Sequence, residues 1–350
     1  MNGAAGRARW VAPGLVIVIV AGTTITLAAL GFDVTRAARA LVNGSFGSWY
    51  AFGSGTLVRA TPLILTGLAV ALAFQSGVFN IGAEGQFLTG AAAASAIALA
   101  AAANRLPGWA VIIGLLLGGS IAGAAWAWIA AELRARFRVL EVISTILLNF
   151  VAAYLVSFLV RGPLQEPTHI YPQTETFAVA ARLPRFGSST RLHAGFAIAC
   201  VACVTCWWVL RYTAAGFRAR IAGANPDAAT SAGGIDVRRV TTRAFVLSGA
   251  LAGLAGAVEV SGVTYALYEN ISPGFGYTAI AVALLARLNA LAVLVTGILF
   301  GALEAGATAM QRDAGVPSVV VSIVEASVIL VMVAADRARI TGGIGRGSGG

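Results

Sequence analysis

The chain has 350 residues, of which 58% are hydrophobic and only 11% are charged. An average soluble domain carries about 25% charged residues, so this composition excludes an ordinary soluble protein. All 24 basic residues are arginine, and a chain without lysine cannot form the phosphate-binding loop of a P-loop ATPase.

Long apolar runs predict an all-α polytopic membrane protein with about ten transmembrane helices, in one transmembrane domain over 1–350. A helix needs about 20 apolar residues to cross a hydrocarbon core of about 30 Å. The first run follows Arg7 and Arg9, and it is too long for an ordinary signal-peptide core, so we predict a retained helix. The predicted spans are 11–31, 57–76, 84–103, 109–131, 142–160, 194–210, 244–262, 277–289, 290–310 and 317–335.

Arginines in the loops predict the orientation of these spans. Short loops that carry arginine usually stay in the cytoplasm. The segment 132–140 carries three arginines and the segment 211–243 carries six, so both are predicted to be cytoplasmic. Alternation then places the loop 161–193 outside and both termini inside. We assign the net charge of +10 to membrane topology and expect no nucleic-acid partner, because the arginines form no stripe with interleaved aromatics.

The segment 77–90, GVFNIGAEGQFLTG, interrupts the apolar sequence between the second and third spans. Backbone that leaves helical geometry at membrane depth has to be buried in protein or face a water-filled cavity. We therefore predict a broken helix in which Asn80 caps the new helix and Glu84 lies in its first turns, near the positive end of the helix dipole. A cytoplasmic hairpin between two spans is the alternative.

Other polar residues within the apolar spans are further candidates for function. Asn149 ends an apolar stretch and either binds a neighbouring helix or contacts a solute. Glu259, Glu304 and Glu325 have no basic partner at helical spacing. The residues predicted to line a pathway are Asn80, Glu84, Gln86 and Asn149.

Two further segments have a less specific pattern. The proline-containing loop 161–193 suits a surface that receives a partner as well as it suits a plain connector. Cys200, Cys203 and Cys206 have a C-x-x-C-x-x-C spacing, but they lie in an apolar run without a fourth thiol. We predict that these cysteines pack as small side chains and that the chain holds no metal.

The large cytoplasmic segment contains the signals of a short helix. Asn225 can act as N-cap, Pro226 suits the first helical position, and Gly233 with Gly234 supplies the stop. A helix of about 10 Å is not stable alone in water, so it is expected to pack against something. That surface is either a partner subunit or the protein's own cytoplasmic face.

Four stretches resemble, in order, the permease subunits of bacterial ATP-binding-cassette (ABC) importers of nucleosides, whose wider class also imports simple sugars and branched-chain amino acids. They are FNIGAEGQ, EVISTILLN at Glu141–Asn149, GFRARIAGANPDAATSAGGIDVRR at Gly216–Arg239, and GFGYTAIAVALLARLN at Gly274–Asn289. The resemblance extends from about Leu57 to Asp336. It departs at Asn289-Ala290-Leu291-Ala292, where the family is expected to have N-P-L-G, so the family's turn is not carried over there.

The resemblance implies a type II ABC importer-like permease in the bacterial cytoplasmic (inner) membrane, surrounded by lipid. It further implies an ABC ATPase subunit that uses ATP and Mg²⁺, a second permease subunit in a heterodimer, and a substrate-binding lipoprotein or periplasmic protein. The chain itself is expected to bind no cofactor and to be a transport subunit, not an enzyme. The segment 211–243 becomes the coupling loop to the ATPase. Its coupling residues would be Gly216, Phe217, Arg218, Gly223, Asn225, Pro226, Asp227, Ala229 and Gly233.

A nucleoside is the expected solute, and a simple sugar is the alternative. An ion-coupled secondary transporter would use broken helices and buried acids as ion sites, but it needs no capped docking helix. An intramembrane enzyme is not expected, because no nucleophile–base pair is found and both histidines, His169 and His193, lie in the outer loop. If the solute is a nucleoside, Phe74, Phe79 or Phe87 could stack on its base.

Overall fold

The computed structural model describes residues 21–103, 106–187 and 189–317, together with the isolated positions 319, 323, 326 and 327. The regular secondary structure of these residues is helical, and β pairing within them is limited to isolated bridges. The chain divides into two units, one of residues Leu57–Gly301 and one that combines Met1–Thr56 with Ala302–Gly350. The molecule is thus an all-helical protein in the part that the structure describes.

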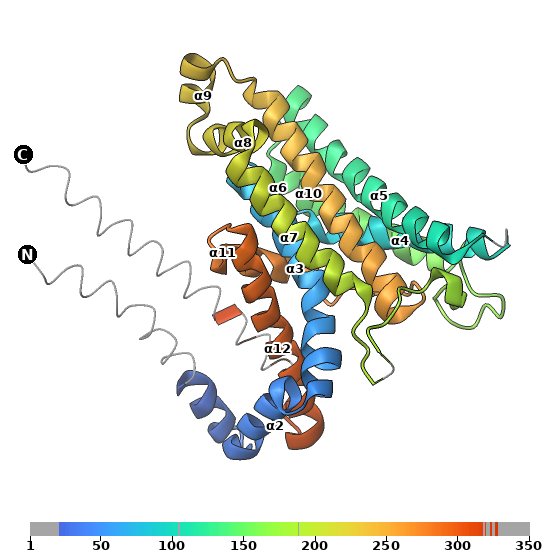
Figure 1. Ribbon diagram of the computed structural model, residues 1–350. Coiled ribbons are helices and arrows are strands. Elements are labelled where there is room, and N and C mark those ends of the chain that lie inside the picture. The colour runs from blue at the N-terminus through green and yellow to red at the C-terminus, as the bar shows by residue number, and fades with distance from the viewer. Residues whose placement is uncertain are drawn as a thin grey trace, which may run out of the picture. The chain divides into compact units, whose positions relative to one another are not determined.

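The larger unit contains the helices that form the membrane core. Its first helices are α3 (Val58–Gln75), α4 (Ala83–Ala103), α5 (Gly108–Phe137), α6 (Glu141–Val160) and α7 (Ala194–Tyr212). They are followed by α8 (Ala214–Ala224), α9 (Pro226–Gly233), α10 (Val237–Glu259) with its π-helical extension Val260–Thr264, α11 (Phe275–Leu285) and the start of α12 (Ala290–Ala314). Figure 1 shows α8 and α9 at one end of this unit and the loop 161–193 at the opposite end.

Seven helical stretches among the described residues are long and apolar enough to cross a membrane. Each coincides with a predicted span, so the chain is a multi-pass membrane protein. The predicted span 11–31 is described only from residue 21, and the predicted span 317–335 lies almost entirely outside the described residues. The seven stretches are Ala51–Gln75, Ala83–Ala102, Gly108–Phe137, Glu141–Val160, Ala194–Tyr212, Val237–Thr264 and Ala290–Ala314.

The predicted span 277–289 is not a spanning helix. The helix there, α11, has 11 residues and is about 16 Å long, roughly half of what a hydrocarbon core requires. Pro273 and Gly274, which has a φ of 100°, precede its start at Phe275, which is two residues before the predicted start. Arg287 and Leu288 adopt left-handed φ values of 50° and 59°, which ends it early. Apolar composition alone could not reveal these breaks.

Glycines bring α4, α5 and α10 into backbone contact. A Cβ atom added at Gly123 would lie 2.3 Å from the carbonyl oxygen of Gly249, and one added at Gly90 would lie 2.3 Å from that of Gly253. Helices in lipid gain little from the hydrophobic effect and associate by close packing of such small residues. These contacts make α4, α5 and α10 a closely packed scaffold.

The loop 161–193 is ordered by pairing with the segment that follows α10. The backbone N–H groups of Thr174, Phe177 and Leu183 donate to carbonyl oxygens of Leu267, Tyr265 and Ser261, each at 2.8 Å. The Phe177 side chain is buried. This loop therefore covers the end of the α10 extension.

The smaller unit contains a helix that the sequence analysis did not predict. Helix α2 (Val34–Phe46) starts at Asp33, whose carboxylate accepts a hydrogen bond from the Arg36 N–H at 3.0 Å. Within this unit the Ser45 hydroxyl donates to the carbonyl oxygen of Ala302 at 2.6 Å, which joins α2 to the second half of α12. The sequence of α2 is amphipathic, with polar residues on one face of the helix, so a search for long apolar runs does not find it.

The glycine contacts lead to a first prediction. Gly123→Ala places a methyl group against the Gly249 backbone and is expected to lower stability by about 1–3 kcal/mol, because backbone cannot move aside as a side chain can. Gly114→Ala on the same helix is the matched control, since its nearest neighbour is an Ile97 methyl at 3.8 Å. The stability of both variants is measured as the fraction of detergent-solubilised protein that stays monodisperse after heating. Equal heat resistance of the two variants would contradict the close packing.

Candidate functional site

The segment predicted to break a helix is non-helical, and it separates two helices that are each long and apolar enough to cross a membrane. The broken helix itself stays a prediction. Between α3 and α4, residues 76–82 are non-helical. The Gly85 N–H in the first turn of α4 donates to Asn149 Oδ1 at 2.8 Å. Asn149 lies about 12 Å along α6 from Glu141, at 1.5 Å per residue. The Phe79 N–H donates to Glu141 Oε1 at the start of α6, so the segment 76–82 runs from that level to the start of α4 and joins two separate spans.

Asn80 and Gln86 lock the non-helical segment. Both are buried, and their amides pair reciprocally at 2.9 and 3.0 Å. Asn80 Nδ2 also donates to Ser248 Oγ at 2.8 Å, and its Oδ1 accepts from the Gly82 N–H at 2.9 Å. These bonds use the polar atoms of Asn80 within the protein. Of the predicted pathway residues, the structure therefore places these two in a structural cluster.

Glu84 connects the starts of two interrupted helices. Its Oε2 accepts a hydrogen bond of 2.7 Å from the Gly276 N–H in the first turn of α11, and Ser272 also bonds to its carboxyl group. The Ser272 hydroxyl accepts from the N–H groups of Gly274 and Phe275 at 3.1 and 3.0 Å, which caps α11. An acid at the start of a helix is favoured by the helix dipole. Helices α4 and α11 consequently begin side by side.

Asn149 supplies the remaining partners for this interrupted backbone. Besides accepting from Gly85, its Nδ2 donates to the carbonyl oxygen of Ile81 at 3.0 Å and contacts the Tyr277 hydroxyl at 3.4 Å. A single amide on α6 thus satisfies backbone groups on both sides of the break. The sequence left open whether Asn149 binds a neighbouring helix or faces a solute. In the structure its amide bonds to the backbone around the start of α4, and the residue also lines a cavity.

A cavity of about 360 Å³ lies directly beside Glu84 and Asn149. This volume is within the range of small-molecule sites. Its wall combines acidic, amide and hydroxyl groups with three aromatic rings. The residues that line it are Glu84, Leu88, Asn149, Phe150, Ala153, Tyr154, Val156, Ser157, Glu269, Asn270, Ser272 and Tyr277.

An ion pair borders this cavity at the end of α6. Arg161 binds Glu269 through two hydrogen bonds of 2.7 Å, and the Ser157 hydroxyl also donates to Glu269. These bonds, chiefly those from Arg161, lower the pKa of Glu269 to about 2, so the carboxylate is ionised at neutral pH. Sequence reasoning missed this pair because the partners are 108 residues apart and lie outside the spanning helices.

The aromatic residues at the cavity are not those considered from sequence. Phe87 is buried against Phe275, with ring centroids 5.6 Å apart, while Phe74 and Phe79 pack on each other at 5.2 Å. None of the three predicted phenylalanines lines the cavity. The aromatic residues that do are Phe150, Tyr154 and Tyr277.

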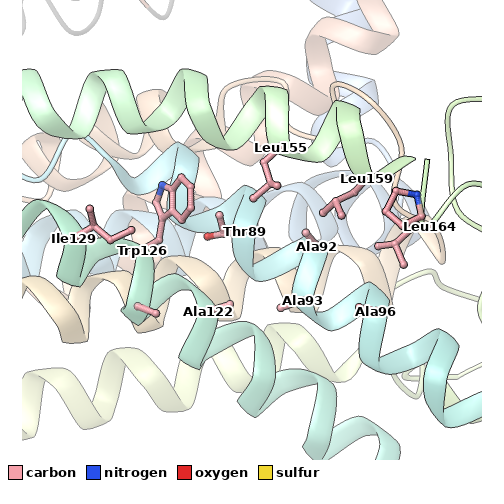
Figure 2. Close-up of a pocket in the computed structure, with 12 residues that line it drawn as sticks. Thr89, Ala92, Ala93, Ala96, Ala122, Trp126, Ile129, Leu155, Leu159 and Leu164 are labelled. Atoms are coloured by element: carbon pink, nitrogen blue, oxygen red, sulfur yellow. The ribbon is translucent and has the colours of Figure 1, made fainter. Parts of the chain in front are cut away.

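A second hollow, of about 460 Å³, is almost wholly apolar (Figure 2). Alanines of α4 and α5 line it together with Trp126 and with Leu155 and Leu159 of α6. Its Thr89 hydroxyl is already bonded to the carbonyl oxygen of Gly85 at 2.9 Å. A polar solute would lose its hydrogen bonds with water there without replacement. The polar cavity is therefore the better candidate site.

The other predicted acids are not among the residues that line this cavity. Glu259 is buried near the end of α10, where the positive charges of Arg59 and Arg191 act on it. Glu304 is partly buried in α12, and Glu325 lies outside the described residues. None of these acids is among the residues that line the polar cavity.

The predicted short helix in the segment 211–243 is present as α9. Asn225 Oδ1 accepts from the Ala228 N–H at 3.0 Å, Pro226 is the first residue, and Gly234 ends the helix with a φ of 56°. Asn225, Pro226 and Asp227 are exposed, while Ala229 is buried. A second helix, α8, precedes α9 and was not predicted.

The glycines of this loop contact the protein itself. A Cβ atom at Gly223 would lie 2.2 Å from the Gln75 carbonyl oxygen at the end of α3, and one at Gly216 would lie 2.2 Å from that of Val209. Gly223, which the resemblance places among the coupling residues, therefore packs closely against the end of α3. Phe217 and Arg218 on α8 are exposed and available to a partner.

Comparisons with known proteins agree with this architecture. Residues 54–334 match the family described as branched-chain amino acid transport system / permease component. The chain is 41% identical over 290 residues to the glucose ABC transporter permease protein TsgB13 of Haloferax volcanii, covering 80% of this chain and 75% of that protein. It is 37% identical over 320 residues to the guanosine ABC transporter permease protein NupP of Bacillus subtilis, covering 90% of each.

A third relative is the nucleoside ABC transporter permease protein NupB of Lactococcus lactis. It is 31% identical over 314 residues, which cover 87% of this chain and 85% of that protein. No solved structure matched the chain.

The amide cluster generates a second prediction. Asn80→Ala is expected to destabilise the protein by about 1–3 kcal/mol for each group left unpaired, since Gln86 and Ser248 stay buried without this partner. The yield of monodisperse protein and its resistance to heating measure the loss. Gln311→Ala removes an exposed amide from α12 and should change neither. An Asn80→Ala protein as stable as the wild type would refute the structural role.

Proposed function

The chain belongs to the family of branched-chain amino acid transport system permease components, and on this premise we propose that it carries a nucleoside inward across the membrane. It is a permease subunit of an ABC transporter and not itself an enzyme. The observation that carries the proposal is the polar cavity beside Glu84, which lies where α4 and α11 are interrupted. Interrupted helices that border a cavity at membrane depth are typical of transport sites.

The composition of the cavity wall supports a neutral solute with hydroxyl groups and a flat ring. Glu84, Glu269 and Ser157 offer acceptors or donors for hydroxyl groups, and Tyr154 and Tyr277 offer aromatic faces. No basic residue is among the described residues that line it. A phosphorylated solute needs cationic partners, so this wall favours a nucleoside over a nucleotide.

A simple sugar is the second candidate, because the relative from Haloferax volcanii is named a glucose permease. A sugar and a nucleoside share hydroxyl groups, which the acids of the cavity would bind in the same way. Only the nucleoside has a base, which would stack on the rings of Tyr154 and Tyr277. The names of NupP and NupB and the aromatic part of the wall favour the nucleoside.

We further propose the surroundings in which this subunit works. The arginine pattern favours cytoplasmic termini in a bacterial inner membrane, with α8 and α9 inside and the loop 161–193 outside. A separate ATPase that uses ATP and Mg²⁺ would supply the work, and a second permease subunit would complete the path. The loop 161–193 would receive a substrate-binding protein.

Uptake by cells that express the complete importer tests the substrate and the cavity together. Labelled guanosine should enter in an ATP-dependent manner, and excess unlabelled nucleoside should compete while excess glucose should not. Glu84→Gln should lower uptake at least tenfold with the protein still present in the membrane, because the shape is kept while the charge is lost.

Glu132→Gln is the control, since its carboxylate pairs with Arg136 on the surface of α5 and is absent from the cavity wall. It should retain uptake near the wild-type rate. Competition by glucose but not by nucleosides would replace the nucleoside with a sugar. Full uptake by Glu84→Gln would remove the cavity from the transport path.

The coupling role proposed for α9 rests on its exposed cap and on its small size. Eight residues form no stable helix alone, so the energetic support of α9 has to come from contacts. Ala229 supplies one such contact within the protein, while Asn225, Pro226 and Asp227 remain free to meet an ATPase. Phe217 on α8 adds an exposed apolar side chain next to this surface.

Replacing Asn225 and Asp227 together by Ala is expected to cost about 1–2 kcal/mol of local helix stability, through loss of the cap and of the favourable charge. The assembled complex should then lose most of its substrate-stimulated ATP hydrolysis. Asp33→Ala removes a cap of equal hydrogen-bond length from α2 and should leave hydrolysis unchanged. Full stimulation in the Asn225/Asp227 variant would disprove coupling through α9.

A further inference from the structure

A pocket at the cytoplasmic ends of α5 and α10 has no part in the path proposed above. It has a volume of about 280 Å³ and lies between the last turns of α5 and the first turns of α10. Half of its wall is polar and half is apolar. The lining residues are Ala131, Arg134, Ala135, Val237, Arg238, Thr241, Thr242 and Phe245.

The two arginines in this wall keep unused hydrogen-bonding capacity. Arg134 Nε lies 3.3 Å from Glu141 Oε2, but its Nη1 is buried without a hydrogen-bond partner. Arg238 is exposed and forms no ion pair within the described part of the chain. The arginines nearby in sequence are already in ion pairs, since Arg136 pairs with Glu132 and Arg239 pairs with Asp236.

We infer that this pocket binds a phosphate ester and that its source is the headgroup of an anionic phospholipid in the cytoplasmic leaflet. Arg134 and Arg238 bring two positive charges and Glu141 offsets one, so a single positive charge remains. A lipid phosphodiester carries one negative charge and matches it. Arginine donates to phosphate oxygens from a planar fork, and the buried Nη1 of Arg134 gains the partner it lacks.

The apolar half of the wall selects the lipid over a soluble phosphate. Ala131 lies one turn further into the membrane than Arg134 along α5, and Phe245 lies one turn further in than Thr241 along α10. A headgroup held by the arginines would therefore continue into acyl chains alongside apolar side chains. Basic pockets between spans on the cytoplasmic side are suited to anionic lipid headgroups.

Native mass spectrometry of the full-length chain in detergent tests this inference. The wild type is titrated with phosphatidylglycerol and, separately, with phosphatidylcholine of identical acyl chains. We expect one phosphatidylglycerol to bind at least tenfold more tightly than phosphatidylcholine. Arg238→Gln should remove most of this preference, and since Arg238 is exposed the change should not affect folding.

Arg239→Gln is the matched control, because it removes the same charge from the next residue, which already pairs with Asp236 and does not line the pocket. It should bind phosphatidylglycerol as the wild type does. Equal binding of both lipids, or equal losses in both variants, would overturn the site. Binding of glycerol 3-phosphate as tight as that of phosphatidylglycerol would overturn the lipid source and leave a soluble phosphate ester as the ligand.

Discussion

The arrangement of the larger unit depends on how unpaired backbone groups are satisfied where helices stop inside a membrane. An unpaired N–H or C=O in hydrocarbon costs several kcal/mol, so an interruption is tolerated only where protein groups take the place of water. Asn149 serves both sides of the break before α4, and Glu84 with Ser272 serves the start of α11. Because these few side chains bond to the free backbone groups, α4 and α11 can both begin here with a cavity beside them.

The same constraint explains why the polar residues fall into two groups. Asn80 and Gln86 hydrogen-bond to each other, and Asn80 also bonds to Ser248. Their loss would therefore change the conformation of the segment 76–82 and not a direct contact with a solute. Glu84 and Asn149 hold the backbone and also line the cavity. A substitution at either position would therefore affect both the cavity wall and the starts of α4 and α11.

Sequence predicted those features that depend on local chemistry. The long spans follow from apolar runs, and α9 follows from the Asn225 cap and the Gly234 stop. The interrupted segment followed from the polar residues and glycines of 77–90. Features that depend on distant partners were missed. The pairing of Arg161 with Glu269 joins residues far apart in sequence, and no periodicity indicates that Phe87 is buried while Tyr154 lines the cavity. The span predicted at 277–289 was wrong because an apolar run does not show where left-handed residues end a helix.

The two polar hollows of the larger unit have opposite charge character, and this difference separates two kinds of ligand. Two acids line the cavity beside Glu84, and Arg161 at its border neutralises Glu269, so Glu84 is left as an acid without a basic partner and makes the cavity less favourable for phosphate. The pocket at Arg134 and Arg238 has a surplus of positive charge and is favourable for phosphate. Phosphate esters of the membrane and the cytoplasm would otherwise compete with a neutral solute for any polar site. On the proposal that the cavity beside Glu84 lies on the solute path, its acid and the separate arginine pocket on α5 and α10 would keep phosphate esters away from the solute.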